Sequence, residues 1–275
     1  MNAMPQRVEQ LFLRTRTAQR AAFIPYICAG DPTLDATVEL ASALERAGAD
    51  LLELGVPFSD PLADGIVNQL AAQRALAAGA TVRGVLDCVR RIREKSEIPI
   101  VLYTYLNPIF QYGFQRFHQV AETAGVDALL ILDLPPDELM EAHDTSLLHI
   151  ALIAPTTSNE RIATICARAA GFIYYVSREG VTGAQASLAA STKERVGQIR
   201  GYTDLPLAIG FGISNPEQAG QVAQIGDAVV VGSAIVKQIE LYGAAPNLAE
   251  RVAQFVRPIA DAVHASRDDS ETRLC

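Results

Sequence analysis

Two carboxylates stand close together in an apolar part of the sequence. Glu53 lies in the run LLELG, and Asp64 follows in a loop that is rich in Pro, Asp and Ser. Burial among apolar residues raises the pKa of a carboxyl group toward the range that a general acid-base catalyst needs. The pattern therefore predicts acid-base chemistry at Glu53. The alternatives are a structural salt bridge at Glu53 and helix capping by Asp64 or Asp60.

Two glycine turns follow apolar runs near the end of the chain. The segments AIGFGIS (208–214) and AVVVGSAI (228–235) each end an apolar run in glycine and lead into a helical pattern. Glycine lets the backbone approach a ligand, and a helix N-terminus supplies free N–H groups. Gly212 and Ser233 are therefore the expected donors to a phosphorylated small substrate, with Gly183 as a third donor from a lid-like loop. Ordinary tight turns are the alternative.

Aromatic residues stand where several apolar runs end. Core packing is the alternative for each of them, but together they predict a pocket for a flat hydrophobic group. These residues are Tyr26, Tyr103, Tyr105, Tyr174 and Phe211. The four histidines form no nucleophile motif and no HExxH, and the four cysteines form no CxxC. No metal site or redox pair is predicted, and Cys28 and Cys166 are expected to be buried thiols.

Strand-like and helix-like segments alternate along the chain. The apolar runs cover 23–28, 50–54, 98–103, 128–132, 150–153, 172–176, 206–209 and 228–231. The helical patterns cover 34–47, 69–95, 114–124, 136–146, 159–169, 189–200, 215–224 and 233–241. This alternation predicts a parallel sheet with helical crossovers, and eight repeats favour a closed (β/α)8 TIM barrel over an open doubly wound sheet.

The fold class is thus α/β, with residues 1–275 forming one domain. An extra helix is expected within residues 1–20, where it would close the bottom of the barrel. A last helix is expected at 246–265, followed by a polar tail at 266–275. Active sites of such barrels lie at the C-terminal ends of the strands, where the two carboxylates and the glycine turns fall.

The composition limits the class of partner. The net charge is −8, which argues against nucleic acid or an anionic membrane as the main partner. No apolar run is long enough to span a bilayer, and the N-terminus lacks the apolar stretch of a signal peptide. A cytoplasmic protein is expected.

The motifs resemble those of the tryptophan synthase α subunit family. ELGVPFSDPLADG (53–65) is that family's most recognisable segment, and the similarity continues through FIPYICAGDPT (23–33), YLNPI (105–109), GFGIS (210–214) and VGSAIV (231–236). The resemblance implies a lyase of tryptophan biosynthesis that cleaves indole-3-glycerol phosphate to indole and glyceraldehyde 3-phosphate without a metal or organic cofactor. It also implies a β chain as partner in an α2β2 complex, with pyridoxal phosphate on the β chain.

The resemblance also implies roles for individual residues. Glu53 matches the catalytic glutamate that moves protons between indole C3 and the glycerol hydroxyl, and Asp64 matches the aspartate that binds the indole N–H. The implied substrate-binding residues are Tyr26, Tyr103, Tyr105, Ile153, Tyr174, Thr182, Gly183, Phe211, Gly212, Gly232 and Ser233. The implied contacts with the β chain are Pro57, Asp60, Asn107 and Pro135.

The chain departs from the family pattern at several positions near this site. Ile66 replaces a proline, Asn68 replaces an apolar residue, and Tyr103 stands where Leu or Met is usual. Leu132 replaces a smaller residue, and Cys28 stands where Thr is common. Two alternatives therefore stay open: a stand-alone lyase that releases free indole, and a non-catalytic barrel that binds and regulates a β chain.

Overall fold

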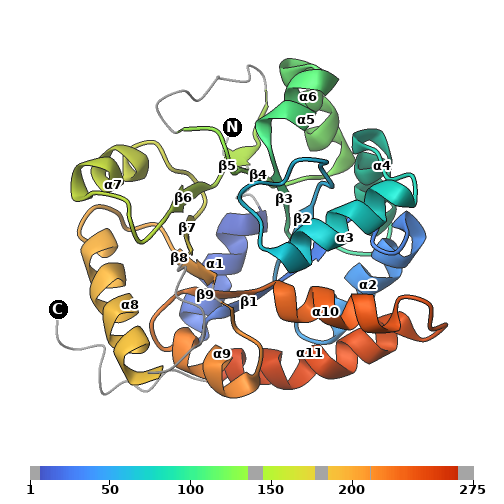
Figure 1. The fold of residues 1–275 in the computed structure, drawn as a ribbon. Helices are drawn as coiled ribbons and strands as arrows, with labels where there is room; N and C mark the ends of the chain where they lie inside the picture. Colours follow the sequence, from blue (N-terminus) through green and yellow to red (C-terminus); the bar gives the residue numbers. More distant parts are fainter. Residues whose placement is uncertain (1–6, 136–144, 177–184, 211, 266–275) are drawn as a thin grey trace.

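A ring of parallel strands forms the centre of the molecule (Figure 1). The computed structural model describes residues 7–135, 145–176, 185–210 and 212–265, with the backbone alone for 185–191. Its strands are β1 (Ala22–Cys28), β2 (Leu52–Gly55), β3 (Ile100–Thr104), β4 (Ala128–Ile131), β5 (Leu148–His149), β6 (Ala151–Ile153), β7 (Ile173–Val176), β8 (Leu207–Gly210) and β9 (Ala228–Val231). The pairing order is β5-β4-β3-β2-β1-β9-β8-β7-β6, and every pair is parallel.

The barrel closes at Ile150. This residue alone separates β5, which pairs with β4, from β6, which pairs with β7. The two ends of the sheet are therefore adjacent along the chain. The run predicted at 150–153 covers β6 but not β5. The described strands make a nearly closed ring, which confirms the predicted barrel architecture.

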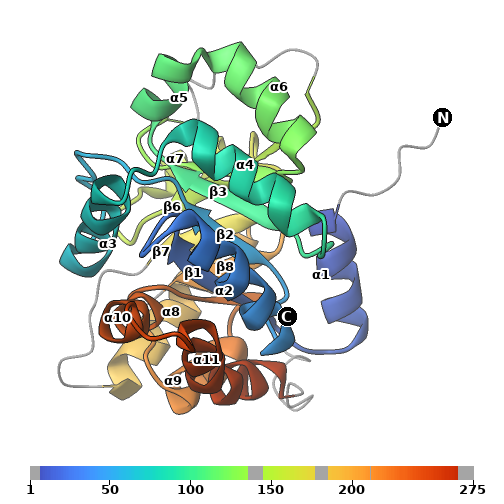
Figure 2. The same ribbon diagram turned by 90° about the vertical axis from the view of Figure 1, so that its right-hand side faces the viewer.

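Helices surround this ring, as the side view in Figure 2 shows. They are α1 (Arg7–Thr17), α2 (Leu34–Arg46), α3 (Ile66–Ala77), α4 (Val82–Arg93), α5 (Leu106–Tyr112), α6 (Phe114–Ala124), α7 (Asn159–Cys166), α8 (Gln185–Arg200), α9 (Pro216–Ala223), α10 (Ser233–Tyr242) and α11 (Leu248–His264). Within the described ranges, none of them is both long and apolar enough to cross a membrane.

Two helical expectations need correction. The segment 69–95 is not one helix, because Gly79 adopts a positive φ of +86° and Thr81 caps a new helix by accepting from the Gly84 N–H. The sequence also gives no expectation of α5, whose Asn-Pro pair is more typical of a turn. Proline is tolerated there because it lies within the first turn, where its missing N–H has no helical partner. The expected helix at 136–146 lies outside the described residues except for 145–146, and the tail at 266–275 lies outside them entirely.

The barrel interior is filled by side chains at alternating strand positions. Leu51, Val101, Leu130 and Ala208 belong to this inner cluster, while their neighbours along the strands pack outward against the helices. Helix α1 closes the N-terminal end of the barrel. Its Val8 and Leu11 are buried in the inner cluster, and its Phe12 ring lies 5.5 Å from the Phe172 ring. This confirms the expected helix at the barrel bottom.

Candidate active site

Glu53 points into the barrel from β2. It lies on the same face of the strand as Leu51 of the inner cluster, and its register partner on β1 is Tyr26. Only 3% of Glu53 is exposed. Burial, together with the nearby charge of Asp64, raises the pKa of Glu53 to about 8. The described residues give Glu53 no ion pair, so the geometry favours an acid-base group over a structural salt bridge.

Asp64 reaches the same region from the loop between β2 and α3. Its Oδ1 accepts a hydrogen bond from Tyr103 Oη at 2.9 Å, and its Oδ2 accepts one from Tyr105 Oη at 2.8 Å. Tyr105 Oη also accepts from the Ala63 N–H at 3.0 Å, which ties the loop to the end of β3. The residue that caps α3 is Gly65, so helix capping by Asp64 is wrong.

Tyrosine rings fill the space around these carboxylates. The edge of Tyr26 meets Tyr103 with 5.1 Å between ring centroids. Tyr174, on β7, is buried, and the charges of Glu53 and Asp64 add to burial in raising its pKa. Burial likewise raises the pKa of Tyr26 and Tyr103, so all three hydroxyls remain protonated donors. The C-terminal ends of the strands therefore hold an aromatic enclosure with two carboxylates.

Two glycines make room for these rings. A Cβ on Gly55 would lie 2.5 Å from Tyr26 Oη, and a Cβ on Gly210 would lie 2.6 Å from Tyr174 Oη. Neither glycine is among the site residues predicted from the sequence. The sequence does hold a signal for both glycines. Each ends a strand whose neighbour in the barrel carries an inward-facing tyrosine.

The predicted phosphate donors lie at the same end of the barrel. Gly232 precedes α10, whose first residue is Ser233, and a Cβ on Gly232 would lie 3.4 Å from Tyr26 Cβ. Gly212 follows β8 and has open space around its Cα. The first-turn N–H groups of α10 thus lie beside the tyrosine enclosure. Thr182, Gly183 and Phe211 lie outside the described residues.

One predicted binding residue does not join this group. Ile153 is fully buried, but it packs with Ile162 and Ile165 of α7 in a cluster outside the barrel. The inward position of β6 is Leu152, because side chains alternate along a strand. The expectation that Ile153 lines the substrate pocket is therefore corrected.

The residues expected to face a partner differ in exposure. Asp60 and Asn107 are exposed, Pro135 is half-buried, and Pro57 is buried. Ile66 opens α3 and is 65% exposed, and Leu62 in the preceding loop is 91% exposed. This loop therefore presents apolar side chains to its surroundings.

Further residues near the site are not among the predicted catalytic or substrate-binding residues. Asn68 Nδ2 lies 3.5 Å from Asp64 Oδ1, and the Phe58 ring packs 5.3 Å from the Tyr105 ring. Leu132 and Pro135 line a neighbouring pocket of about 320 Å³. Cys28 and Cys166 are buried free thiols, as expected. The described residues hold no cluster of three or more His, Cys, Asp or Glu side chains that could bind a metal ion.

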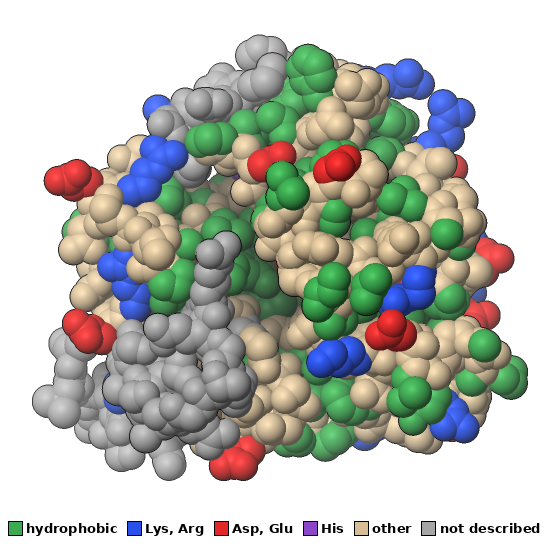
Figure 3. Space-filling model, in the orientation of Figure 1, with side chains coloured by type: hydrophobic (Ala, Val, Ile, Leu, Met, Phe, Trp, Pro, Cys, Tyr) green, Lys and Arg blue, Asp and Glu red, His purple; other side chains and the backbone are tan. Residues whose placement is uncertain are grey.

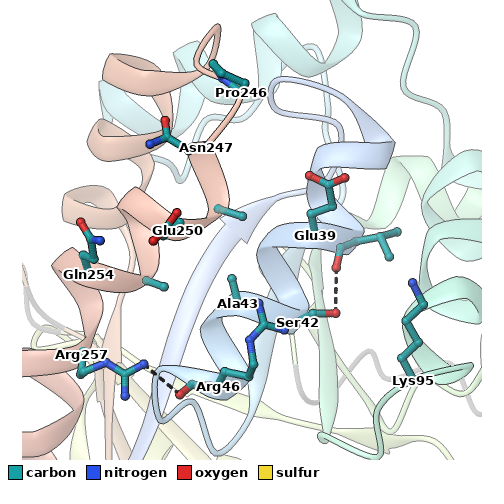
Figure 4. A pocket seen from close by; sticks show the side chains of 13 residues that line it. Glu39, Ser42, Ala43, Arg46, Lys95, Pro246, Asn247, Glu250, Gln254 and Arg257 are labelled. Atoms are coloured by element: carbon teal, nitrogen blue, oxygen red, sulfur yellow. Dashed lines mark hydrogen bonds between the residues drawn. The ribbon is translucent and has the colours of Figure 1, made fainter.

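A hollow in the surface of the molecule is consistent with this position of the candidate site. The face seen in Figure 3 is hollowed near its centre, and hydrophobic side chains line the hollow. A separate groove of about 860 Å³ lies on the outer wall between α2 and α11, where Arg46 and Arg257 are neighbours (Figure 4). It contains neither Glu53 nor Asp64 and is not the candidate site.

Comparisons with known proteins identify one family. The family model described as tryptophan synthase alpha chain matches residues 12–264. The tryptophan synthase alpha chain of Opitutus terrae is 55% identical over 237 residues, covering 85% of this chain and 89% of the relative. That of a Geobacter species is 49% identical over 261 residues, covering 94% and 97%.

Solved structures match as well. Tryptophan synthase subunit alpha from Legionella pneumophila superposes with a TM-score of 0.87 at 39% identity, covering 94% of this chain and 99% of that one. An open form of tryptophan synthase from M. tuberculosis gives a TM-score of 0.84 at 32% identity, with coverages of 94% and 99%. The chain therefore belongs to the tryptophan synthase alpha chain family, the lyases that cleave indole-3-glycerol phosphate in tryptophan biosynthesis.

Proposed function

We propose that Glu53 and Asp64 are the residues with which this chain cleaves indole-3-glycerol phosphate. The observation that carries the proposal is the buried carboxyl group of Glu53, whose pKa of about 8 keeps it protonated at neutral pH beside the Asp64 carboxylate. A protonated acid and an ionised carboxylate in one enclosure can perform different tasks.

The proposed proton transfers begin and end with the same form of Glu53. Its carboxyl group protonates indole C3, which gives the ring a positive charge that Asp64 stabilises at the N–H. The resulting Glu53 carboxylate takes the proton of the glycerol hydroxyl next to the ring. The C–C bond then breaks, its electron pair returns to the ring, and indole and an aldehyde leave with Glu53 protonated again.

The phosphate end of the substrate is assigned to the turns after β8 and β9. Support comes from the N-terminus of α10 at Ser233, which lies beside Tyr26 and offers first-turn N–H groups. The indole then extends among Tyr26, Tyr103 and Tyr174. Thr182, Gly183 and Phe211 keep their proposed roles as lid, phosphate donor and wall of the indole pocket.

A β chain is the proposed partner, in an α2β2 assembly. The exposed Asp60, Asn107 and Leu62 support this, since they lie on segments that follow the strands β2 and β3. Pyridoxal phosphate would belong to that partner, and the alpha chain would need no cofactor of its own. We place the assembly in the cytoplasm.

The deciding experiment is an indole-release assay with and without a β chain. Glu53→Gln should abolish release while the variant still folds and binds substrate, and near-normal turnover would contradict the mechanism. Adding the β chain to the natural enzyme should raise cleavage at least roughly tenfold, or about 1.4 kcal/mol of barrier.

A stand-alone lyase is the second candidate. It is favoured by one observation, namely that Asp64 is already held by Tyr103 and Tyr105 within the single chain. Turnover that does not change when a β chain is added would support this candidate. A chain that regulates a partner without cleaving substrate would instead show no indole release in either assay.

A further inference from the structure

Both carboxylate oxygens of Asp64 are held by tyrosine hydroxyls. Tyr103 donates to Oδ1 at 2.9 Å, and Tyr105 donates to Oδ2 at 2.8 Å. Tyr103 lies within β3, and Tyr105 follows directly after it. An aliphatic side chain cannot donate a hydrogen bond, so the contact with Oδ1 requires the hydroxyl of Tyr103.

The Tyr103 hydroxyl is itself firmly placed. Tyr103 pairs with Gly55 in the register of β2 and β3, and its ring meets the buried Tyr26 ring at an angle of 68°. Burial raises the pKa of Tyr103, and the charge of Asp64 raises it further, so the hydroxyl keeps its proton. The donor, Tyr103, therefore lies on a rigid strand, and its acceptor, Asp64, lies on a half-buried loop.

A second side chain, that of Asn68, lies near the same oxygen. Asn68, in the first turn of α3, has its Nδ2 atom 3.5 Å from Asp64 Oδ1. Its own Oδ1 is buried without a hydrogen-bond partner among the described residues. Asn68 and Tyr103, which are 35 positions apart, thus both lie within 3.5 Å of one carboxylate oxygen. This convergence indicates that the orientation of Asp64 is set within the chain.

We propose that Tyr103 is a positioning residue that fixes the Asp64 carboxylate for the indole N–H. The inference rests on the function proposed for Asp64. An ionised carboxylate has about four lone-pair directions, and one tyrosine on each oxygen leaves a free direction for the substrate while preventing rotation. Holding an acceptor in place before the ligand arrives strengthens binding, because less freedom is lost on association.

The test compares two inhibitors that cannot be cleaved. One is an indole-3-alkyl phosphate without the glycerol hydroxyls, and the other has a benzothiophene ring of nearly the same shape but without the N–H. The ratio of their Kd values isolates the contact with Asp64, because the phosphate and the ring are common to both. The natural enzyme should prefer the indole compound at least tenfold.

Tyr103→Phe should reduce this preference three- to tenfold and change the Kd of the benzothiophene compound less than twofold. The ring and its contact with Tyr26 remain in this variant, so a merely structural role would affect both compounds equally. Tyr103→Leu, with the residue that the family usually has, should reduce the ratio to the same degree. Tyr112→Phe is the matched control, since Tyr112 also makes an edge contact, with Phe117, but lies on α5.

Asp64→Ala separates the two proposals. It should abolish the preference, and adding Tyr103→Phe to it should change nothing further. A natural enzyme without preference would overturn the role of Asp64 and this inference with it. A preference that survives Tyr103→Phe, or an equal further loss in the double variant, would overturn the role of Tyr103 alone.

Discussion

The ring of Tyr26 occupies the space that a side chain on Gly55 would need. A Cβ on Gly55 would lie 2.5 Å from Tyr26 Oη and 2.9 Å from two ring carbons. Because Tyr26 in turn supports Tyr103, the glycine sets the position of a chain of contacts that ends at Asp64. A residue without a side chain thus belongs to the architecture of the site.

Gly55→Ala should therefore displace Tyr26 and weaken the binding of an indole-3-alkyl phosphate at least tenfold. Overpacking of this kind typically costs about 1–3 kcal/mol of stability. Gly197→Ala on α8 is the control, since a Cβ there meets nothing within 4 Å and should leave affinity unchanged. Calorimetric titration and thermal unfolding measure both effects, and unchanged affinity in Gly55→Ala would contradict the account.

Glu53→Gln should stabilise the protein while it abolishes catalysis. The folded-state pKa of about 8 lies above the ordinary value of 4.5, so the folded state keeps a proton that the unfolded chain loses. Stability from this group is therefore full below about pH 4.5 and is lost as the pH rises toward 8. At pH 7 this difference in proton binding lowers the free energy of unfolding by roughly 3 kcal/mol. The neutral glutamine should restore that stability.

Denaturant unfolding at pH 5 and pH 8 checks this prediction. The difference between the natural protein and Glu53→Gln should grow with pH, and a constant difference would contradict a raised pKa. In the activity assay, cleavage by the natural enzyme should decline as the pH rises through about 8, because the acid form of Glu53 is needed for the first proton transfer.

Two histidines link α6 to β5 and should make stability depend on pH. The Nε2 atoms of His118 and His149 lie 3.2 Å apart, and His118 Nδ1 donates to the Phe114 carbonyl at 2.8 Å. His118 Nε2 is then the acceptor, and neutral His149 donates to it. Burial and the neighbouring His118 lower the pKa of His149 from 6.5 to about 4.

Stability should fall as the pH drops from about 6.5 toward 4, since the unfolded chain binds protons that the folded pair excludes. The loss should be on the order of 1–3 kcal/mol. His149→Gln keeps an N–H donor but cannot titrate, so its denaturant midpoint should be less sensitive to pH over this interval. Equal slopes for both proteins would contradict a depressed pKa at His149.

Arg74 should contribute far more to stability than an exposed arginine. It holds the buried Asp31 with two hydrogen bonds, of 2.9 and 2.7 Å, and so joins α3 to the loop after β1. Arg74→Ala should cost about 3 kcal/mol, because it leaves a buried charge without a partner. Arg91 pairs at 2.7 Å with the exposed Asp35, and Arg91→Ala should destabilise the protein much less, because solvent screens an exposed ion pair. Similar losses in the two variants would contradict this contrast.

The sequence predicts the barrel because its apolar runs repeat strongly, but weaker signals fail at particular residues. Gly79 interrupts a helical pattern that is continuous from 69 to 95, and β5 lies at 148–149, before the predicted run at 150–153. The sequence also brings Glu53 and Asp64 to the same end of the barrel. It does not predict that Tyr103 Oη donates to Asp64, because that contact depends on how a loop folds back over a strand 39 positions away.

Ile153 also shows a limit of what the sequence can predict. Its strand can be recognised from the sequence, but which residues face inward depends on the register with β7, where Leu152 lies opposite Tyr174. A shift of one position exchanges the two faces of a strand. Which of two neighbouring strand residues faces the site therefore depends on strand register as well as on the pattern of the sequence.

The α1 helix at the bottom of the barrel has a consequence for diffusion. Val8, Leu11 and Phe12 seal that end with side chains packed against Phe172, and the interior above them is filled. Substrate and both products must then pass through the opposite end, above Glu53. Whatever binds over that end therefore covers the route by which the substrate enters and both products leave.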